Sequence, residues 1–144
     1  MEILGHHIGG KRVDGSGTRQ GEVFNPATGQ VARHVRFANQ ADVETVVAAA
    51  RDAFPGWAST TPLRRARVLF KYLELLNKHR DEIGKLITAE HGKVASDAGG
   101  EVTRGVEVVE FATGIPHLLA GNFTEQVGTE IDSWAVRQPL GICV

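Results

Sequence analysis

The sequence predicts an α/β fold, and three observations support that prediction. Short segments in which apolar and polar residues alternate open the chain, and alternation with a period of two is typical of β-strands. Three longer segments with apolar residues three and four positions apart follow, as expected for amphipathic helices. After residue 121 the chain returns to short β-type segments.

The composition is that of an ordinary globular protein. The 144 residues carry a formal net charge of −1, with 42% hydrophobic and 23% charged residues. A near-neutral charge gives no electrostatic reason to expect a nucleic-acid partner. The N-terminus lacks the basic and apolar regions of a secretory signal, and no apolar run is long enough to cross a bilayer. We therefore expect a cytoplasmic protein with no membrane partner.

The N-terminal region is expected to be β-structure. Residues 8–13 lead as one β segment into the glycine-rich turn 14–17, and residues 22–24 and 31–37 are the next two strands. Residues 25–29, Asn-Pro-Ala-Thr-Gly, join these two strands as a turn, because proline fixes φ and the glycine can adopt a positive φ. The expected arrangement is a strand–turn–strand unit.

The first helix is expected to begin after Asn39, a good capping residue, with Asp42 in its first turn. The pair Pro55-Gly56 is expected to end it.

A second helical segment is expected to open at Thr61-Pro62, with threonine as the cap and proline at the first helical position. Residues 78–80 are expected to bend it into two helices. It should end at His91-Gly92, where glycine is a common helix C-cap.

The third helical segment runs from near Ser96 to Thr113. Three of its residues are glycines, which cost about 1 kcal/mol each relative to alanine in a helix. These glycines are Gly99, Gly100 and Gly105. Their presence suggests that another segment packs closely against this helix. Glu101, Arg104 and Glu107 follow one another at intervals of three residues. This spacing predicts surface ion pairs between Glu101 and Arg104 and between Arg104 and Glu107.

The C-terminal part is expected to hold strands at residues 123–127 and 131–138, followed by the start of a buried apolar strand at 139–144. Because a strand that stops within an apolar run exposes unpaired backbone, we expect the chain to be truncated there. Cys143 lies in this run and is expected to be a buried structural cysteine rather than a reactive thiol.

Local chemistry identifies few further candidates. No Gly-x-Gly-x-x-Gly follows a strand, and no P-loop is present. Residues 91–93, His-Gly-Lys, lack the flanking residues of a phosphate cradle, so a helix C-cap with solvated neighbours is the better interpretation. His6-His7 would need ligands from elsewhere to bind a metal, and a surface pair is favoured; we predict no metal site.

Five segments together resemble the aldehyde dehydrogenase superfamily, and the resemblance extends over the whole chain. They are Ile8-Gly9-Gly10-Lys11, residues 24–29 (Phe-Asn-Pro-Ala-Thr-Gly), Phe54-Pro55-Gly56-Trp57, residues 89–93 (Ala-Glu-His-Gly-Lys) and residues 138–142 (Gln-Pro-Leu-Gly-Ile). A sixth segment, residues 100–112, resembles the methylmalonate-semialdehyde dehydrogenase branch of that family.

This resemblance implies the N-terminal portion of the aldehyde dehydrogenase fold, truncated before the catalytic domain. Residues 1–121 would be strands and helices of the NAD-binding domain, whose helices pack on a Rossmann-like sheet. Residues 122–138 would be oligomerisation strands of a homo-oligomer, and residues 139–144 the start of the first nucleotide-binding strand. We expect the isolated chain to be loosely folded or prone to aggregate.

The resemblance also implies the chemistry of the parent enzyme, an oxidoreductase of valine catabolism. A cysteine nucleophile attacks malonate or methylmalonate semialdehyde, NAD accepts hydride, and the acyl group passes to the co-substrate CoA with loss of CO₂. In the family the nucleophile, the base and the oxyanion asparagine lie beyond this segment. No catalytic or cofactor-binding residue is therefore expected in the chain, which would be inactive alone, and Cys143 is not the nucleophile.

One site residue transfers by resemblance. The substrates of this branch carry a carboxylate, which calls for a bidentate cation, and Arg104 matches the branch's arginine in the run Glu-Val-x-Arg-Gly-x-Glu. Gly105 would let the helix approach the substrate tunnel. The competing interpretation is an arginine paired with Glu101 or Glu107 on a solvated helix face.

Two other functions stay open at the level of sequence. The first is another aldehyde dehydrogenase branch that uses water rather than CoA. The second is a short, non-catalytic assembly module that pairs through exposed strands.

Overall fold

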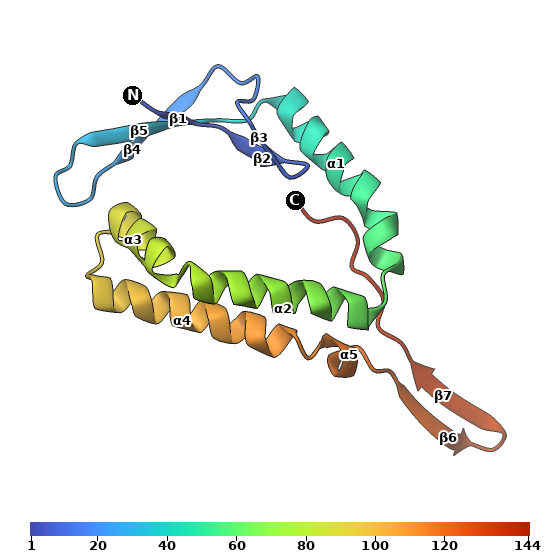
Figure 1. Cartoon of the computed structure of the whole chain (residues 1–144). Coiled ribbons are helices and arrows are strands. Elements are labelled where there is room, and N and C mark those ends of the chain that lie inside the picture. The colour runs from blue at the N-terminus through green and yellow to red at the C-terminus, as the bar shows by residue number, and fades with distance from the viewer.

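The computed structural model describes all 144 residues. The N-terminal strands and α1 lie on one side of the molecule, and α2, α3 and α4 form a helical layer on the other (Figure 1). The β6–β7 hairpin projects away from both, and the C-terminal segment runs back into the space between α1 and α2 (Figure 1). The predicted mixture of strands and helices is confirmed.

Five short strands make up the N-terminal region. They are β1 (Ile3–Leu4), β2 (His6–Ile8), β3 (Lys11–Val13), β4 (Gln20–Phe24) and β5 (Val31–Arg36). In the three-stranded sheet β5 is central, with β1 parallel to it on one side and β4 antiparallel on the other. The predicted turn between β4 and β5 is present, with Gly29 at φ 69°.

The prediction of one β segment over residues 8–13 is wrong. Gly9 and Gly10 have φ values of 58° and 77° and form a tight turn between β2 and β3, which pair as an antiparallel hairpin. Two positive φ angles in a row suit the two-residue turns that join such strands, and glycine reaches them without steric cost.

Helix α1 (Gln40–Ser59) begins as predicted but ends later. Asn39 and Asp42 form a reciprocal capping box at its start. Pro55 does not end the helix; it lies inside it. The end is determined at residues 60–61, which are extended, since the residue before Pro62 disfavours the helical region.

Four further helices follow: α2 (Pro62–Lys78), α3 (Arg80–His91), α4 (Ala95–Ala112) and the short α5 (Ile115–Leu118). The predicted bend is present at His79, between α2 and α3. Gly92 caps α3 in the left-handed conformation at φ 78°, which confirms the interpretation of this glycine as a C-cap.

The small core lies where α4 packs against α2 and α3. Its buried apolar residues are Ala66, Ala98, Val102 and Val106. The close packing expected around the α4 glycines is not found: an added Cβ at Gly99, Gly100 or Gly105 would have no neighbouring atom within 4 Å.

The C-terminal part contains the hairpin of β6 (Asn122–Gly128) and β7 (Ile131–Ala135). The second strand is shorter than expected, and residues 136–144 form no strand. The expectation of a buried Cys143 is wrong, because no strand lies beside this segment to cover it and the thiol is exposed. None of the helices has the length and apolar character needed to cross a membrane.

Candidate functional site

Arg104, the substrate-binding residue suggested by the sequence, lies in the middle of α4 and is exposed. Residues four and seven positions later share its side of the helix, and both are exposed apolar residues, Val108 and Phe111. Arg104 therefore presents its charge on a surface that is otherwise partly apolar.

The ion pairs predicted for Arg104 are not formed. Glu101 instead binds the ammonium group of Lys93, which lies in the loop between α3 and α4. Arg104 makes no ion pair and no hydrogen bond through its side chain, and Glu107 is also unpaired. The competing interpretation, an arginine neutralised by its helical neighbours, is thus not what the structure contains.

The environment of Lys93 also differs from the expected solvated lysine. Its side chain is 27% exposed and that of Glu101 is 38% exposed, so the pair is partly shielded from water. The hydrogen bond from Lys93 is the main cause that lowers the pKa of Glu101 below its ordinary value, with smaller contributions from the charges of Lys93, His91 and Arg104.

A second contact holds the same part of α4. The guanidinium of Arg80, at the start of α3, donates a hydrogen bond to the hydroxyl of Thr103, which in turn donates to the carbonyl of Gly99 at 3.0 Å. Together with the Lys93–Glu101 pair, this contact fixes α4 against the preceding segment on either side of residue 102. The backbone that carries Arg104 is therefore held in place.

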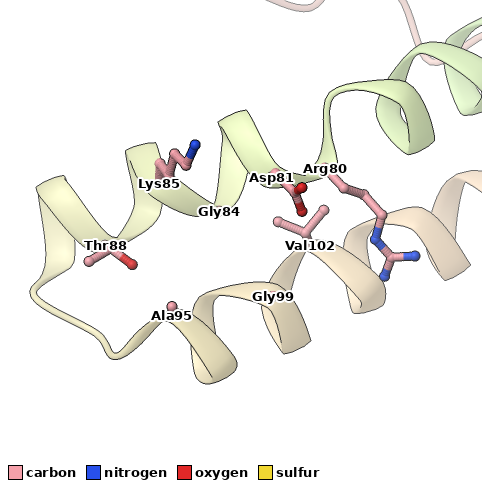
Figure 2. A pocket seen from close by; sticks show the side chains of 8 residues that line it. All are labelled: Arg80, Asp81, Gly84, Lys85, Thr88, Ala95, Gly99 and Val102. Carbon is pink, nitrogen blue, oxygen red and sulfur yellow. The ribbon is translucent and has the colours of Figure 1, made fainter.

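A hollow of about 360 Å³ lies between α3 and α4. Figure 2 shows Val102 pointing from α4 toward α3 and the Arg80 side chain reaching from the start of α3 toward α4. The hollow is lined by Arg80, Asp81, Gly84, Lys85, Thr88, Ala95, Gly99 and Val102. Gly84 and Gly99 leave it open, since neither has a neighbour within 4 Å of an added Cβ. Arg104 is not among its lining residues and lies on a different face of α4.

The glycine-rich turn at residues 14–17 lies beside the start of α1, and the backbone N–H groups of Ser16 and Gly17 in this turn are bound to Asp42. The Asp42 carboxylate accepts hydrogen bonds from the N–H groups of Ser16 at 2.8 Å, Gly17 at 3.1 Å and Asn39 at 3.1 Å, and from the Ser16 hydroxyl at 2.9 Å. These hydrogen bonds lower the pKa of Asp42 from 3.8 to about 2, and the bond from the Asn39 N–H makes the largest contribution.

The position of Asp42 at this turn decides whether the turn could bind the phosphates of a dinucleotide. A phosphate at a helix N-terminus needs free N–H groups and no competing anion, and Asp42 both occupies these donors and carries a negative charge. The residues present therefore do not form a dinucleotide cradle at this turn. Sequence reasoning placed Asp42 only in the first turn of α1; an acidic residue at the third helical position after an asparagine cap was the available signal.

The remaining candidates do not form a reactive cluster. No group of three or more His, Cys, Asp or Glu side chains is placed to hold a metal ion. His7 is exposed, whereas His6 is half-buried with no hydrogen-bond partner for Nε2, so the expected surface pair is only half correct.

The sequence profile of the Aldehyde dehydrogenase family matches residues 13–144. The chain belongs to the aldehyde dehydrogenase family, as the sequence motifs indicated.

Among the relatives are malonate-semialdehyde dehydrogenase 2 from Bacillus anthracis, 45% identical over 98% of this chain, and malonate-semialdehyde dehydrogenase from Pseudomonas aeruginosa, 42% identical over 99%. The crystal structure of methylmalonate-semialdehyde dehydrogenase (DddC) from Oceanimonas doudoroffii matches 97% of the chain with a TM-score of 0.90 and 49% identity. A Sinorhizobium meliloti 1021 protein, provisionally named methylmalonate-semialdehyde dehydrogenase and complexed with NAD, matches 98% with a TM-score of 0.91 and 48% identity.

The match covers only part of each relative. The chain spans 29% of the Bacillus anthracis protein, 28% of the Pseudomonas aeruginosa protein and 28–29% of the two solved chains. The comparisons confirm the N-terminal portion of the aldehyde dehydrogenase fold that the sequence predicted.

Proposed function

We propose that the chain is part of an NAD-dependent aldehyde dehydrogenase whose substrates are malonate and methylmalonate semialdehyde. The products would be acetyl-CoA and propionyl-CoA, formed with CoA as co-substrate and with release of CO₂. The names of relatives that are 42–49% identical to the chain support the substrate class. The single observation in the structure that favours it is the exposed, unpaired Arg104 on α4.

Arg104 fits the role of a carboxylate receptor. A guanidinium offers parallel N–H donors that match the two oxygens of a carboxylate, and it stays charged at every physiological pH. Because Arg104 takes part in none of the ion pairs of the chain, its guanidinium N–H groups are available to a ligand. In this proposal Arg104 binds the carboxylate at the end of the substrate opposite the aldehyde.

The same proposal assigns the parts of the chain. Residues 1–121 would belong to the NAD-binding domain, 122–138 to the oligomer interface, and 139–144, which form no strand here, to the first nucleotide-binding strand. The dinucleotide and the catalytic groups would be held by residues outside this chain, so the chain alone would be inactive. A cytoplasmic location and a place in valine catabolism belong to the proposal as well.

The test replaces Arg104 in the intact enzyme. With Arg104→Met we expect kcat/KM for methylmalonate semialdehyde to fall about 10- to 100-fold, the range for a lost hydrogen-bonded charge contact. Propionaldehyde, which has no carboxylate, should be oxidised at an unchanged rate. Arg104→Lys keeps the charge but loses the bidentate geometry and should be intermediate.

Equal losses for both aldehydes would contradict the proposed role of Arg104. The products distinguish the alternative branch: release of the free acid rather than an acyl-CoA, with CoA present, would favour a dehydrogenase that uses water. An intact gene product without NAD-linked oxidation of either aldehyde would favour a non-catalytic assembly module.

A further inference from the structure

Lys93, His91 and Arg104 all act on the Glu101 carboxylate, and Lys93 is the one that forms an ion pair with it. Glu101 precedes Arg104 by three residues on α4, a spacing at which acidic and basic side chains commonly pair. It nevertheless binds Lys93 from the loop that precedes the helix. The charge of Arg104 acts on Glu101 only as the smallest of the contributions that lower its pKa.

The partner of Glu101 affects Arg104, because Glu101 carries the same functional group, a carboxylate, as the ligand proposed for Arg104. Both the glutamate side chain and a substrate semialdehyde present a carboxylate, and a guanidinium binds either in the same manner. A carboxylate one helical turn away is tethered, so it competes at a high effective concentration. A free Glu101 would therefore occupy Arg104 part of the time.

The position of Lys93 suits it to prevent this competition. It follows Gly92, whose left-handed conformation ends α3 and turns the chain toward α4. Its side chain is largely shielded at 27% exposure and is bound to Glu101. The Arg80–Thr103 hydrogen bond joins α3 to α4 two residues beyond Glu101 and so holds the part of α4 that carries Glu101 against α3.

We propose that Lys93 is a positioning residue for substrate binding: by holding the carboxylate of Glu101, it keeps Arg104 free for the carboxylate of the substrate. This inference rests on the proposed function, because it requires Arg104 to bind the substrate. It adds a second determinant of specificity that acts through Glu101 without touching the substrate.

The test uses Lys93→Met in the intact enzyme with two aldehydes. The KM for methylmalonate semialdehyde should rise about two- to threefold, the extent to which an i,i+3 ion pair of ordinary strength forms. The kcat for that substrate and both constants for propionaldehyde should not change. Adding Glu101→Gln removes the competing carboxylate, so the double variant should regain the KM of the unsubstituted enzyme. Lys93→Arg retains a cation that can bind Glu101 and should have that same KM.

A matched control is available on α2. Lys71 binds Glu74 at 2.8 Å on an exposed face, so Lys71→Met removes the same charge and the same kind of ion pair. It should leave both KM values unchanged. If Lys93→Met lowers the yield of folded enzyme, Lys93→Gln makes the same comparison with a smaller loss of polarity.

An unchanged KM in the Lys93 variant, or a raised KM that Glu101→Gln does not restore, would overturn the inference. A rise for both aldehydes would also overturn it, since it would indicate damage to the loop rather than competition at Arg104. Failure of the proposed function is detected separately: if Arg104→Met retains its preference for the carboxylate-bearing aldehyde, Arg104 does not bind substrate and the role of Lys93 falls with it.

Discussion

Asp42 joins two parts of the chain that are far apart in sequence. Its carboxylate caps α1 through the Asn39 N–H and holds the turn at Ser16 and Gly17 through two further N–H groups and a hydroxyl. A carboxylate that accepts several N–H bonds strongly favours the ionised form. The ionised side chain therefore stabilises both the start of the helix and the turn.

The stability of this region should depend on pH in one direction. The pKa of Asp42 is lowered from 3.8 to about 2 by folding, so the unfolded chain takes up a proton at a higher pH than the folded chain. The stabilisation is fully present above about pH 4 and is lost as the pH falls toward about 2. Asp42→Asn should lower the denaturant midpoint of the intact protein at neutral pH, and the difference from the unsubstituted protein should shrink over that range.

The control for this experiment is Asp52→Asn on the exposed side of α1, since Asp52 makes no ion pair or hydrogen bond. It removes the same charge and should leave the pH profile unchanged. A constant difference between the Asp42 variant and the unsubstituted protein from pH 5 to pH 2 would contradict the assignment.

Among the elements, the β6–β7 hairpin projects away from the rest of the chain and has no extensive contact with another helix or strand (Figure 1). Phe123 and Trp134 lie directly opposite each other in its register and are 66% and 70% exposed. A bulge between Thr124 and Gly128 interrupts the ladder, where the Asp132 carboxylate accepts a hydrogen bond from the Gln126 N–H at 2.8 Å. An isolated two-stranded hairpin is marginally stable in water, which supports the proposal that another subunit covers it.

Trp134→Glu in the intact enzyme tests that proposal. Burial of a large side chain contributes about 1.5–3 kcal/mol, and a charge placed there would be costly to desolvate. We expect a lower molar mass in sedimentation than for the unsubstituted enzyme, whereas Trp134→Phe should retain the original mass. Identical masses for all three proteins would exclude this face from the interface.

At the scale of the whole molecule, the chain buries little surface. Its accessible area is 10,926 Å², whereas a compact monomer of 15.5 kDa would expose about 7,200 Å². Only 6 of 144 residues are buried, and exposed apolar side chains occur on every helical element from α1 to α5. Contacts within the chain therefore supply only a small part of the burial that usually stabilises a domain.

The isolated 144-residue chain is accordingly expected to be loosely folded or aggregated. Size-exclusion chromatography should show a broad or early peak, and heating should give no cooperative transition. A sharp monomer peak with a cooperative melt would contradict this expectation.

Sequence reasoning succeeded where a structural feature depends on residues within about one helical turn. The caps at Asn39, Thr61 and Gly92 were predicted, as was the bend at His79. It failed at Pro55, because a proline is only one of several local influences on where a helix ends, and the following Thr61-Pro62 pair decided the boundary.

The sequence by itself determined the family, the three long helical segments with their caps, and Arg104 as the candidate site, because motifs and caps consist of residues close together in the chain. It did not predict the strand Ile3–Leu4 or the hairpin of β2 and β3. Only the tertiary structure decided that Glu101 binds Lys93 and that the Asp42 carboxylate accepts hydrogen bonds from the N–H groups of the glycine-rich turn. The physical reason is that a side chain with two possible partners binds the one that the fold brings closer. Spacing along a helix identifies one of those partners, whereas the path of the neighbouring loop supplies the other.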